Sequence, residues 1–285
     1  MGKKKHKGKR EKKTGSTATA TNSVAAETIS LLEQSQISPH YKASADQRRR
    51  LQRALSSALY VPNCLELCAP RNNGQTTNPQ LVLYQGGSLE AAEWASQHQF
   101  AAATTQPTEQ WFKPAVLDFA SDSNPGGGWR GRQQGTQEEE ICRLTSLGLS
   151  LERLSSFSIP STGCVYVPDV AVMRNRSGAW LENPFWCATV AASLRSADNP
   201  EWIQSKIRGV LAVATGNGHG VFVGGAWGCG AFGNDLELVA EAWRIAAKGI
   251  SSDSLAMLVL ALPSKTAFDA FCSVLPDAIV VGRET

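Results

Sequence analysis

The chain has 285 residues, of which 42% are hydrophobic and 19% are charged, and its formal net charge is +3. This length and balance predict one or two domains with a sizeable core and exclude a wholly disordered chain. No apolar run approaches the roughly 20 residues of a transmembrane helix, so we expect no membrane association. The seven cysteines include no CxxC pair, which favours reduced thiols in an intracellular protein over a disulfide framework or a zinc site.

Positive charge is concentrated at the N-terminus. Residues 1–14 hold eight Lys and Arg against one Glu, whereas the remaining residues hold 20 basic and 24 acidic side chains. A block of like charge is typical of disorder, and the low-complexity residues 15–23 extend it, so we expect a disordered basic leader over residues 1–23. Two interpretations of this tail stay open: nuclear entry or polyanion contact, and solubility alone. We expect a nuclear or cytoplasmic protein.

Two helices are predicted after the leader, over residues 24–36 and 44–59, within an N-terminal helical extension that spans residues 24–79. Leucines recur every four residues from Leu51 to Leu59 in the second helix, as on one face of a helix. The same helix has a run of three arginines, which we expect to face water rather than nucleic acid.

From about residue 80 the pattern changes to short apolar runs that alternate with helical periodicity. The expected strands and apolar runs cover residues 81–84, 115–120, 164–167, 188–192, 221–225 and 255–262, and the expected helices cover residues 89–97, 138–149, 201–214, 236–247 and 267–275. This alternation predicts an α/β domain over residues 80–285, a three-layer α/β/α sandwich with a mostly parallel or mixed sheet. Ligands of such sheets bind beyond the carboxyl ends of the strands.

Two glycine-rich segments leave predicted strands. The first, residues 119–131, contains Gly126-Gly127-Gly128, and the second, residues 224–235, leads into a helix. Glycine lets the backbone approach a ligand closely, exposed amides bind anions, and a helix N-terminus adds positive charge. We expect these segments to hold a diphosphate from two sides, although a flexible surface loop is the plainer interpretation of each glycine run.

Three glutamates follow the first glycine segment, in the string Gln137-Glu138-Glu139-Glu140 at the start of a predicted helix. Acids in a first helical turn contribute about 0.3–1 kcal/mol each through the helix dipole, and need no other role. Their position next to a phosphate site lets one of them reach an attached sugar. Glycosidic cleavage needs a carboxylic acid that protonates the leaving oxygen. Adjacent glutamates fit one acid/base and one ligand of ribose hydroxyls better than two carboxylates that flank a bond.

The string Gly126-Gly127-Gly128, eight residues, then Gln137-Glu138-Glu139 resembles the GGG and QEE signature of poly(ADP-ribose) glycohydrolases. The wider pattern is similar to the microbial type: Phe119-Ala120-Ser121, Glu140-Ile141-Cys142-Arg143, Val167-Pro168-Asp169-Val170 and Gly225-Ala226-Trp227-Gly228-Cys229-Gly230-Ala231-Phe232-Gly233-Asn234. The resemblance covers roughly residues 25–275. It implies a macrodomain with an N-terminal helical extension, and a hydrolase that needs neither a metal nor a diffusible cofactor.

The resemblance also implies roles for individual residues. Glu139 matches the catalytic acid, which would protonate the ribose–ribose glycosidic oxygen and then deprotonate water, and Glu138 would bind ribose hydroxyls. Phe232 would pack on the ribose, and Gln137 would position the glutamates. The implied substrate-binding set is Gly126, Gly127, Gly128, Gln137, Gly228, Cys229, Gly230, Ala231, Phe232, Gly233 and Asn234.

Two other functions stay open at this point. One is a module that binds ADP-ribose without cleaving it, and the other is a hydrolase of single ADP-ribose units on protein or DNA. The expected partners are ADP-ribose polymer or ADP-ribosylated macromolecules, and we expect a monomer.

Arg130 and Arg132, in the eight-residue spacer, either face solvent or bind polymer phosphates. His219 lies in a Gly-Asn-Gly context that favours a turn or cap over catalysis.

Overall fold

The computed structural model is built on one eight-stranded sheet in the order β1-β4-β5-β3-β6-β7-β2-β8. It describes residues 15–67, 77–98, 108–131, 135–195 and 199–282. Neighbouring strands pair antiparallel from β1 to β5 and parallel from there to β8. The mixed sheet that the sequence predicts is confirmed. The strands are β1 (Leu59–Val61), β2 (Gln80–Tyr84), β3 (Ala115–Phe119), β4 (Cys164–Arg174), β5 (Trp180–Ala192), β6 (Val221–Gly225), β7 (Met257–Ala261) and β8 (Ile279–Val281).

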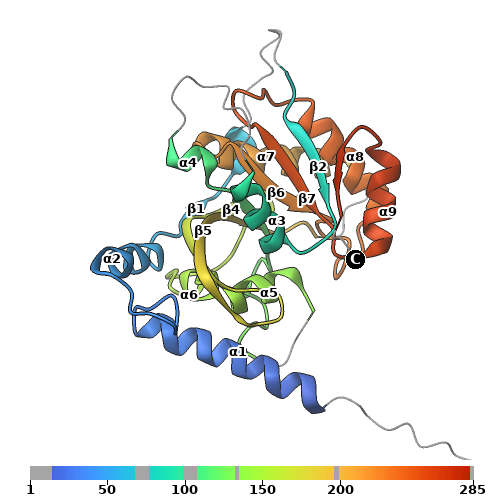
Figure 1. The fold of residues 1–285 in the computed structure, drawn as a ribbon. Helices are drawn as coiled ribbons and strands as arrows, with labels where there is room; N and C mark the ends of the chain where they lie inside the picture. The colour runs from blue at the N-terminus through green and yellow to red at the C-terminus, as the bar shows by residue number, and fades with distance from the viewer. Residues whose placement is uncertain (1–14, 68–76, 99–107, 132–134, 196–198, 283–285) are drawn as a thin grey trace, which may run out of the picture.

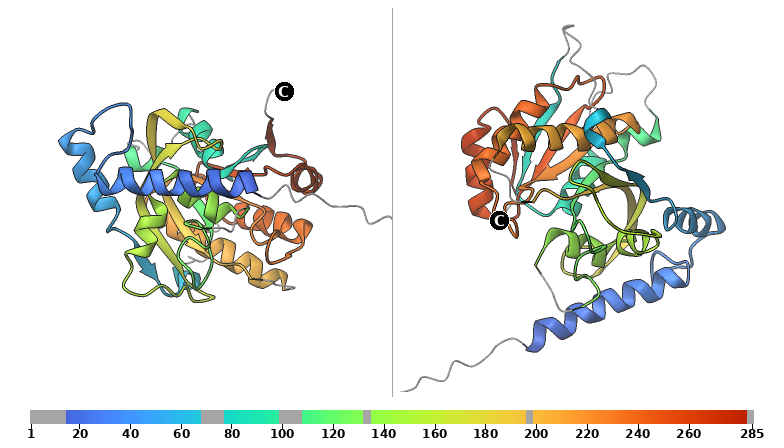
Figure 2. Two further views of the ribbon diagram at one scale, coloured as in Figure 1. Left: turned by 90° about the horizontal axis from the view of Figure 1, so that it is seen from below. Right: turned by 180° about the vertical axis from the view of Figure 1, so that it is seen from behind.

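Helices cover both faces of this sheet, which gives the three layers (Figure 1). One face is covered by α1 (Gly15–Glu33), α2 (Ala45–Ala54), α3 (Ser88–Gln97), α5 (Gln137–Leu144) and α6 (Leu147–Glu152), and the other by α7 (Pro200–Gly216), α8 (Leu236–Ala247) and α9 (Lys265–Val274). Two short helices, η1 (Cys64–Leu67) and α4 (Glu109–Phe112), complete the described elements. Helix α1 lies across the bottom of the molecule, beneath α5 and α6 (Figures 1 and 2).

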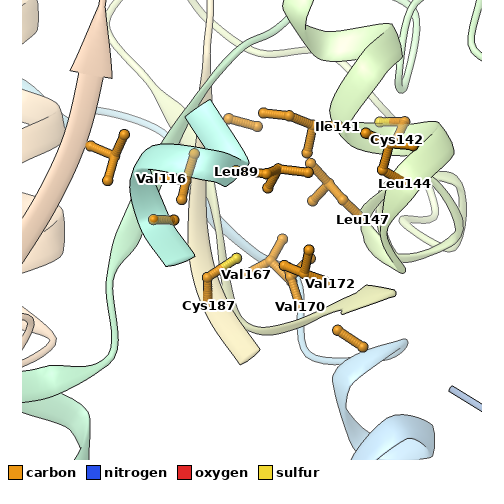
Figure 3. Packing of buried hydrophobic residues seen from close by; sticks show 14 of the residues in the cluster. Leu89, Val116, Ile141, Cys142, Leu144, Leu147, Val167, Val170, Val172 and Cys187 are labelled. Atoms are coloured by element: carbon orange, nitrogen blue, oxygen red, sulfur yellow. The ribbon is translucent and has the colours of Figure 1, made fainter. Parts of the chain in front are cut away.

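Alternate residues of the central strands belong to different cores. In β3, Val116 packs with α3 and α5, whereas Leu117 packs with the helices of the other face. Figure 3 shows the first core, where Leu89, Val116 and Ile141 point toward one another between helices and sheet. Because both faces are buried, such strands appear in the sequence as continuous apolar runs, and these are the strands that the sequence predicts best.

The predicted helix over residues 138–149 is wrong as one element, because it divides into α5 and α6 around Thr145. The backbone of Thr145 is extended, with φ −136° and ψ 179°. Its hydroxyl donates to the Ile141 carbonyl at 2.8 Å and accepts from the Leu147 amide at 3.0 Å. One side chain therefore ends the first helix and caps the turn that follows, which is a role that threonine favours over the helix interior.

The N-terminal region differs most from expectation. Residues 24–79 do not form a purely helical extension, because β1 pairs with β4 and extends the central sheet. The helix predicted over residues 44–59 ends at Ala54. Helix α1 begins at Gly15, inside the segment predicted as a disordered leader, and residues 1–14 lie outside the described part of the chain. In the described residues, no helix is long and apolar enough to cross a membrane.

Candidate active site

A cavity of about 840 Å³ lies where β3, β6 and β7 end, the position expected for a ligand of an open α/β sheet. Both glycine segments and the first turn of α5 line it. Its volume falls in the range of about 300–1,000 Å³ that is typical of small-molecule sites. Of the predicted site residues, the cavity wall contains Gly127, Gly128, Gln137, Glu138, Glu139, Gly228, Cys229, Gly230, Ala231 and Phe232.

Gln137 fixes the start of α5 to the end of β3. Its Oε1 atom accepts from the Phe119 amide at 2.8 Å, and its Nε2 atom donates to the Leu117 carbonyl at 2.7 Å and to the Ser88 hydroxyl at 3.0 Å. Three hydrogen bonds to protein occupy most of the amide's capacity. The geometry fits the expected positioning role, and direct substrate contact by Gln137 stays a prediction.

Thr136 starts α5 with a reciprocal cap. Its hydroxyl accepts from the Glu139 amide at 3.3 Å, and the Glu139 carboxylate accepts from the Thr136 amide at 3.4 Å. Such a capping box satisfies two amides that the helix leaves without partners. It also places the Glu139 carboxylate at the helix N-terminus, on the side of the cavity.

The two glutamates bind opposite ends of the first glycine segment. Glu138 Oε2 accepts from the Ser121 amide at 2.8 Å, and Glu139 Oε1 accepts from the Gly128 amide at 3.0 Å. Both residues are only 3% exposed. A Cβ atom on Gly127, whose φ is +60°, would lie 3.0 Å from Glu138 Oε2. Glycine is therefore required at this position by its backbone conformation and by the carboxylate beside it.

Burial dominates the electrostatics of the carboxylates. It raises the pKa of Glu138 to about 7, with a smaller contribution from Glu139, while backbone amides of Ser121 and Gly126 oppose the change. Beneath them, Asp118 of β3 is fully buried, and neither carboxylate oxygen has a hydrogen-bond partner. Burial and the nearby Glu138 hold the pKa of Asp118 well above its usual range.

The second glycine segment forms a closed turn before α8. Gly228 has φ +74°, and its carbonyl accepts from the Asn234 amide at 3.0 Å. The Asn234 side chain donates to the Leu194 carbonyl at 3.2 Å. A Cβ atom on Gly228 would lie 2.2 Å from that side chain, so no other residue fits this turn without rearrangement. Asn234 and Gly233, like Gly126 of the first segment, shape the loops without lining the cavity.

Comparison with known proteins identifies the family. Residues 25–175 match the model of the microbial-type PARG catalytic domain, where PARG stands for poly(ADP-ribose) glycohydrolase. The chain belongs to this family. The matched range is more than half of the chain and includes the first glycine segment and α5, but it ends before the second. No curated protein matches the sequence.

Solved PARG structures share the fold. The PARG of Thermomonospora curvata has a TM-score of 0.71 and 24% identity, with 90% of this chain and 99% of that chain covered. The same enzyme bound to the inhibitor ADP-HPD gives 0.68 and 25%, with the same coverage. The PARG of Deinococcus radiodurans in complex with ADP-ribose gives 0.62 and 24%, over 77% of this chain and 94% of that chain. The three-layer fold expected from the resemblance is confirmed.

The cavity wall and its surroundings also contain residues that the sequence did not indicate. Arg195, after β5, donates to Asp122, after β3, with one N–O distance of 2.8 Å, and its guanidinium lies 5.8 Å from the centre of the Phe232 ring. This contact joins three loops at the cavity wall. The sequence shows Asp118 as a lone acid in an apolar strand, but it does not show that this side chain is fully buried. Arg195 has no sequence signal, because its partners are distant in the chain.

Two side chains with open interpretations are now placed. Arg130 forms a bidentate ion pair with Glu152, in which both N–O distances are 2.6 Å. Its guanidinium is therefore bound to the protein rather than free in solvent. Arg132 lies outside the described residues. His219 is fully buried, with its ring nitrogens near the Lys113 carbonyl and the Tyr166 hydroxyl, both at 2.8 Å. Burial lowers the pKa of His219 to about 4, and the residue does not line the cavity.

Proposed function

We propose that this protein hydrolyses the ribose–ribose O-glycosidic bonds of poly(ADP-ribose) and releases ADP-ribose, with Glu139 as the general acid and base. The proposal rests above all on one observation: the Glu139 carboxylate lies on the wall of the cavity, nearly buried, and accepts a hydrogen bond from Gly128 of the glycine segment. A proton donor and a row of main-chain amides are thus side by side. This is the arrangement that a glycosidic bond next to a diphosphate requires.

The main chain would bind the diphosphate. Residues of both glycine segments line the cavity, and α5 and α8 begin next to it with their N-terminal positive dipoles. Of the predicted substrate-binding set, Gly127, Gly128 and residues 228–232 line the cavity, whereas Gly126, Gly233 and Asn234 would support them from behind. Phe232, in the cavity wall, would pack on the ribose next to the scissile bond.

The reaction then needs one proton transfer from Glu139 to the leaving oxygen and one from water back to Glu139. Glu139 gives its proton to the glycosidic oxygen, the bond from that oxygen to the ribose carbon breaks, and the electron pair stays on the leaving hydroxyl. The positive charge that develops on the ribose is stabilised by the carboxylates beside it. A water molecule attacks this carbon and gives its proton to Glu139, which restores the acid. Glu138 Oε1, which is buried and has no protein partner, would accept from a ribose hydroxyl.

The carboxylates argue against a module that only binds ADP-ribose. Such a module needs the amides of the glycine segments, but buried acids beside a diphosphate repel it and lower the stability of the fold. The raised pKa of Glu138, about 7, shows that this destabilisation is substantial here. Acids with a perturbed pKa, such as Glu138, are typical of catalytic sites.

An activity panel tests the proposal. The full chain is incubated with poly(ADP-ribose), with a mono-ADP-ribosylated protein and with ADP-ribosylated DNA, and free ADP-ribose is quantified by chromatography. We expect release from the polymer at a rate well above that from either mono-modified substrate. Tight ADP-ribose binding without release from any substrate would contradict the proposal and support a binding module.

We also propose that the basic residues 1–14 contact polyanions, because this segment of the sequence has eight cations against one acid. Polymer affinity of the full chain should then fall more steeply with salt concentration than that of a variant without residues 1–14. Equal salt dependence would show that the tail contributes solubility alone. A nuclear or cytoplasmic location stays a prediction, which a tagged full chain would test.

A further inference from the structure

Arg143, in the last turn of α5, is a buried cation without a partner. Its exposed fraction is 8%, and its buried Nη1 atom has no hydrogen bond. Within the described residues, no carboxylate lies within 4 Å of its guanidinium. A buried guanidinium without compensation is costly, so a fold that keeps one needs a reason for it.

Arg143 lies one helical turn beyond Glu139. Residues four apart on a helix share a face, and helical side chains lean toward the N-terminal turn, so the guanidinium leans back toward the Glu139 side chain. Both side chains line the same cavity. Burial lowers the pKa of Arg143, and the negative charge of Glu139 opposes this more strongly than that of Glu140.

Among the described cations of the cavity wall, Arg143 alone has no carboxylate within ion-pair distance. Arg195 is neutralised by Asp122, and Arg176 lies 3.6 Å from Glu140 and 3.9 Å from Glu90. Arg143 is therefore the guanidinium in this wall whose charge and hydrogen-bond capacity remain available to a ligand. An arginine with free donors is well suited to a phosphate group, since its forked N–H groups match the phosphate oxygens.

The order of groups along the substrate indicates which of its phosphates Arg143 would bind. The glycine segments would hold the diphosphate of the unit being released, and Glu139 would hold the scissile oxygen, which is bonded on its other side to the leaving unit. Gly128 contacts the Glu139 carboxylate from the glycine segment, and Arg143 follows Glu139 by one turn of α5. A substrate that extends from the glycine segments past Glu139 toward Arg143 would place its leaving unit at Arg143.

We propose that Arg143 binds a phosphate of the leaving ADP-ribose unit, and so favours polymer over substrates whose leaving group has no phosphate. This inference rests on the proposed hydrolysis of poly(ADP-ribose). It assigns Arg143 to substrate selection beyond the scissile bond, whereas the glycine segments bind the unit that is released.

Two matched substrates test the inference. One is a linear ADP-ribose dimer, and the other is the same molecule with the leaving unit shortened to adenosine, so that the leaving hydroxyl is identical and the diphosphate and second ribose of the leaving unit are missing. Wild type, Arg143→Met and the control Arg208→Met are compared by kcat/KM on both substrates and by affinity for free ADP-ribose. Arg208 is exposed on α7 and lines no part of the cavity.

We expect wild type and Arg208→Met to prefer the dimer by about 10- to 100-fold, the effect of one hydrogen-bonded charge pair. Arg143→Met should lose this preference, keep its rate on the shortened substrate and its affinity for ADP-ribose, and melt at a higher temperature, because an unpaired buried charge is gone. Equal losses on both substrates, or weaker ADP-ribose binding, would overturn the inference. Wild type that cleaves neither substrate would instead overturn the proposed function on which it rests.

Discussion

Replacing Glu138 with glutamine should make the protein more stable at alkaline pH but not at acid pH. The pKa of Glu138 is about 7 in the folded protein, against an ordinary value of 4.5. At 1.36 kcal/mol per pKa unit, this difference corresponds to about 3 kcal/mol. Between these two pKa values the folded state binds more protons than the unfolded state, so the free energy of unfolding falls as pH rises from about 4 to 8.

Glutamine has nearly the same shape as glutamate and cannot ionise, so the free energy of unfolding of the variant should not fall with pH for this reason. Urea unfolding at pH 4, 6 and 8 measures this free energy. We expect Glu138→Gln to gain about 3 kcal/mol relative to wild type between pH 4 and pH 8, and the control Glu237→Gln, an exposed acid in the first turn of α8, to gain nothing comparable. A stability difference that is the same at all three pH values would refute the assignment of a raised pKa to Glu138.

Three further substitutions test the surroundings of the carboxylates. Gly127→Ala should lower the free energy of unfolding by about 1–2 kcal/mol, because of the positive φ, and displace the Glu138 carboxylate, which a fall in kcat would report. Gln137→Ala leaves the Phe119 amide and the Leu117 carbonyl without partners, and should lower the melting temperature by an amount equivalent to about 2–4 kcal/mol. Asp118→Asn should make stability fall less steeply with rising pH than in the wild type, because a carboxyl with a raised pKa destabilises the fold when it ionises and an amide cannot ionise; an equally steep fall in the variant would contradict a raised pKa for Asp118.

Among the described charged side chains, those with buried unpartnered atoms line the cavity or lie next to it. Asp118, Glu138 and Arg143 all have buried polar atoms without a hydrogen bond, and they come from β3 and α5 alone. Elsewhere in the described residues, the buried Arg174 is paired with Glu27, and the nearly buried Lys113 is paired with Asp169. Native structures satisfy most buried polar groups, and exceptions of this kind concentrate where function needs them. The protein thus accepts a loss of stability at the proposed site.

The sequence predicts most elements of the sheet because both of its faces are buried. Strands β2, β3, β6 and β7 are mostly apolar, with Gln80 at the start of β2 and Asp118 within β3 as the exceptions, and the helices between them have clear periodicity. The long strands β4 and β5 extend beyond their apolar centres into polar residues with a register shift, which removes the alternation on which a prediction relies. The edge strands β1 and β8 have three residues each, too few for any pattern.

The candidate site was predictable where its residues are adjacent in the chain. The glycine run and the glutamates of α5 lie within one stretch of sequence, so their proximity follows from the strand–loop–helix order. The depth of Asp118, the ion pair of Arg195 with Asp122 and the missing partner of Arg143 depend on packing between distant segments. No pattern in a single sequence reports such contacts.

Turnover of poly(ADP-ribose) by Glu139→Gln, measured beside its affinity for ADP-ribose, tests the central claim most directly. General acid and base catalysis contributes about 10²–10⁴-fold, so we expect ADP-ribose release to fall by at least that lower factor. The affinity for ADP-ribose should stay within about threefold, because main-chain amides bind the diphosphate, and Glu237→Gln should match wild type in both measurements. Near-normal turnover by Glu139→Gln would contradict the account.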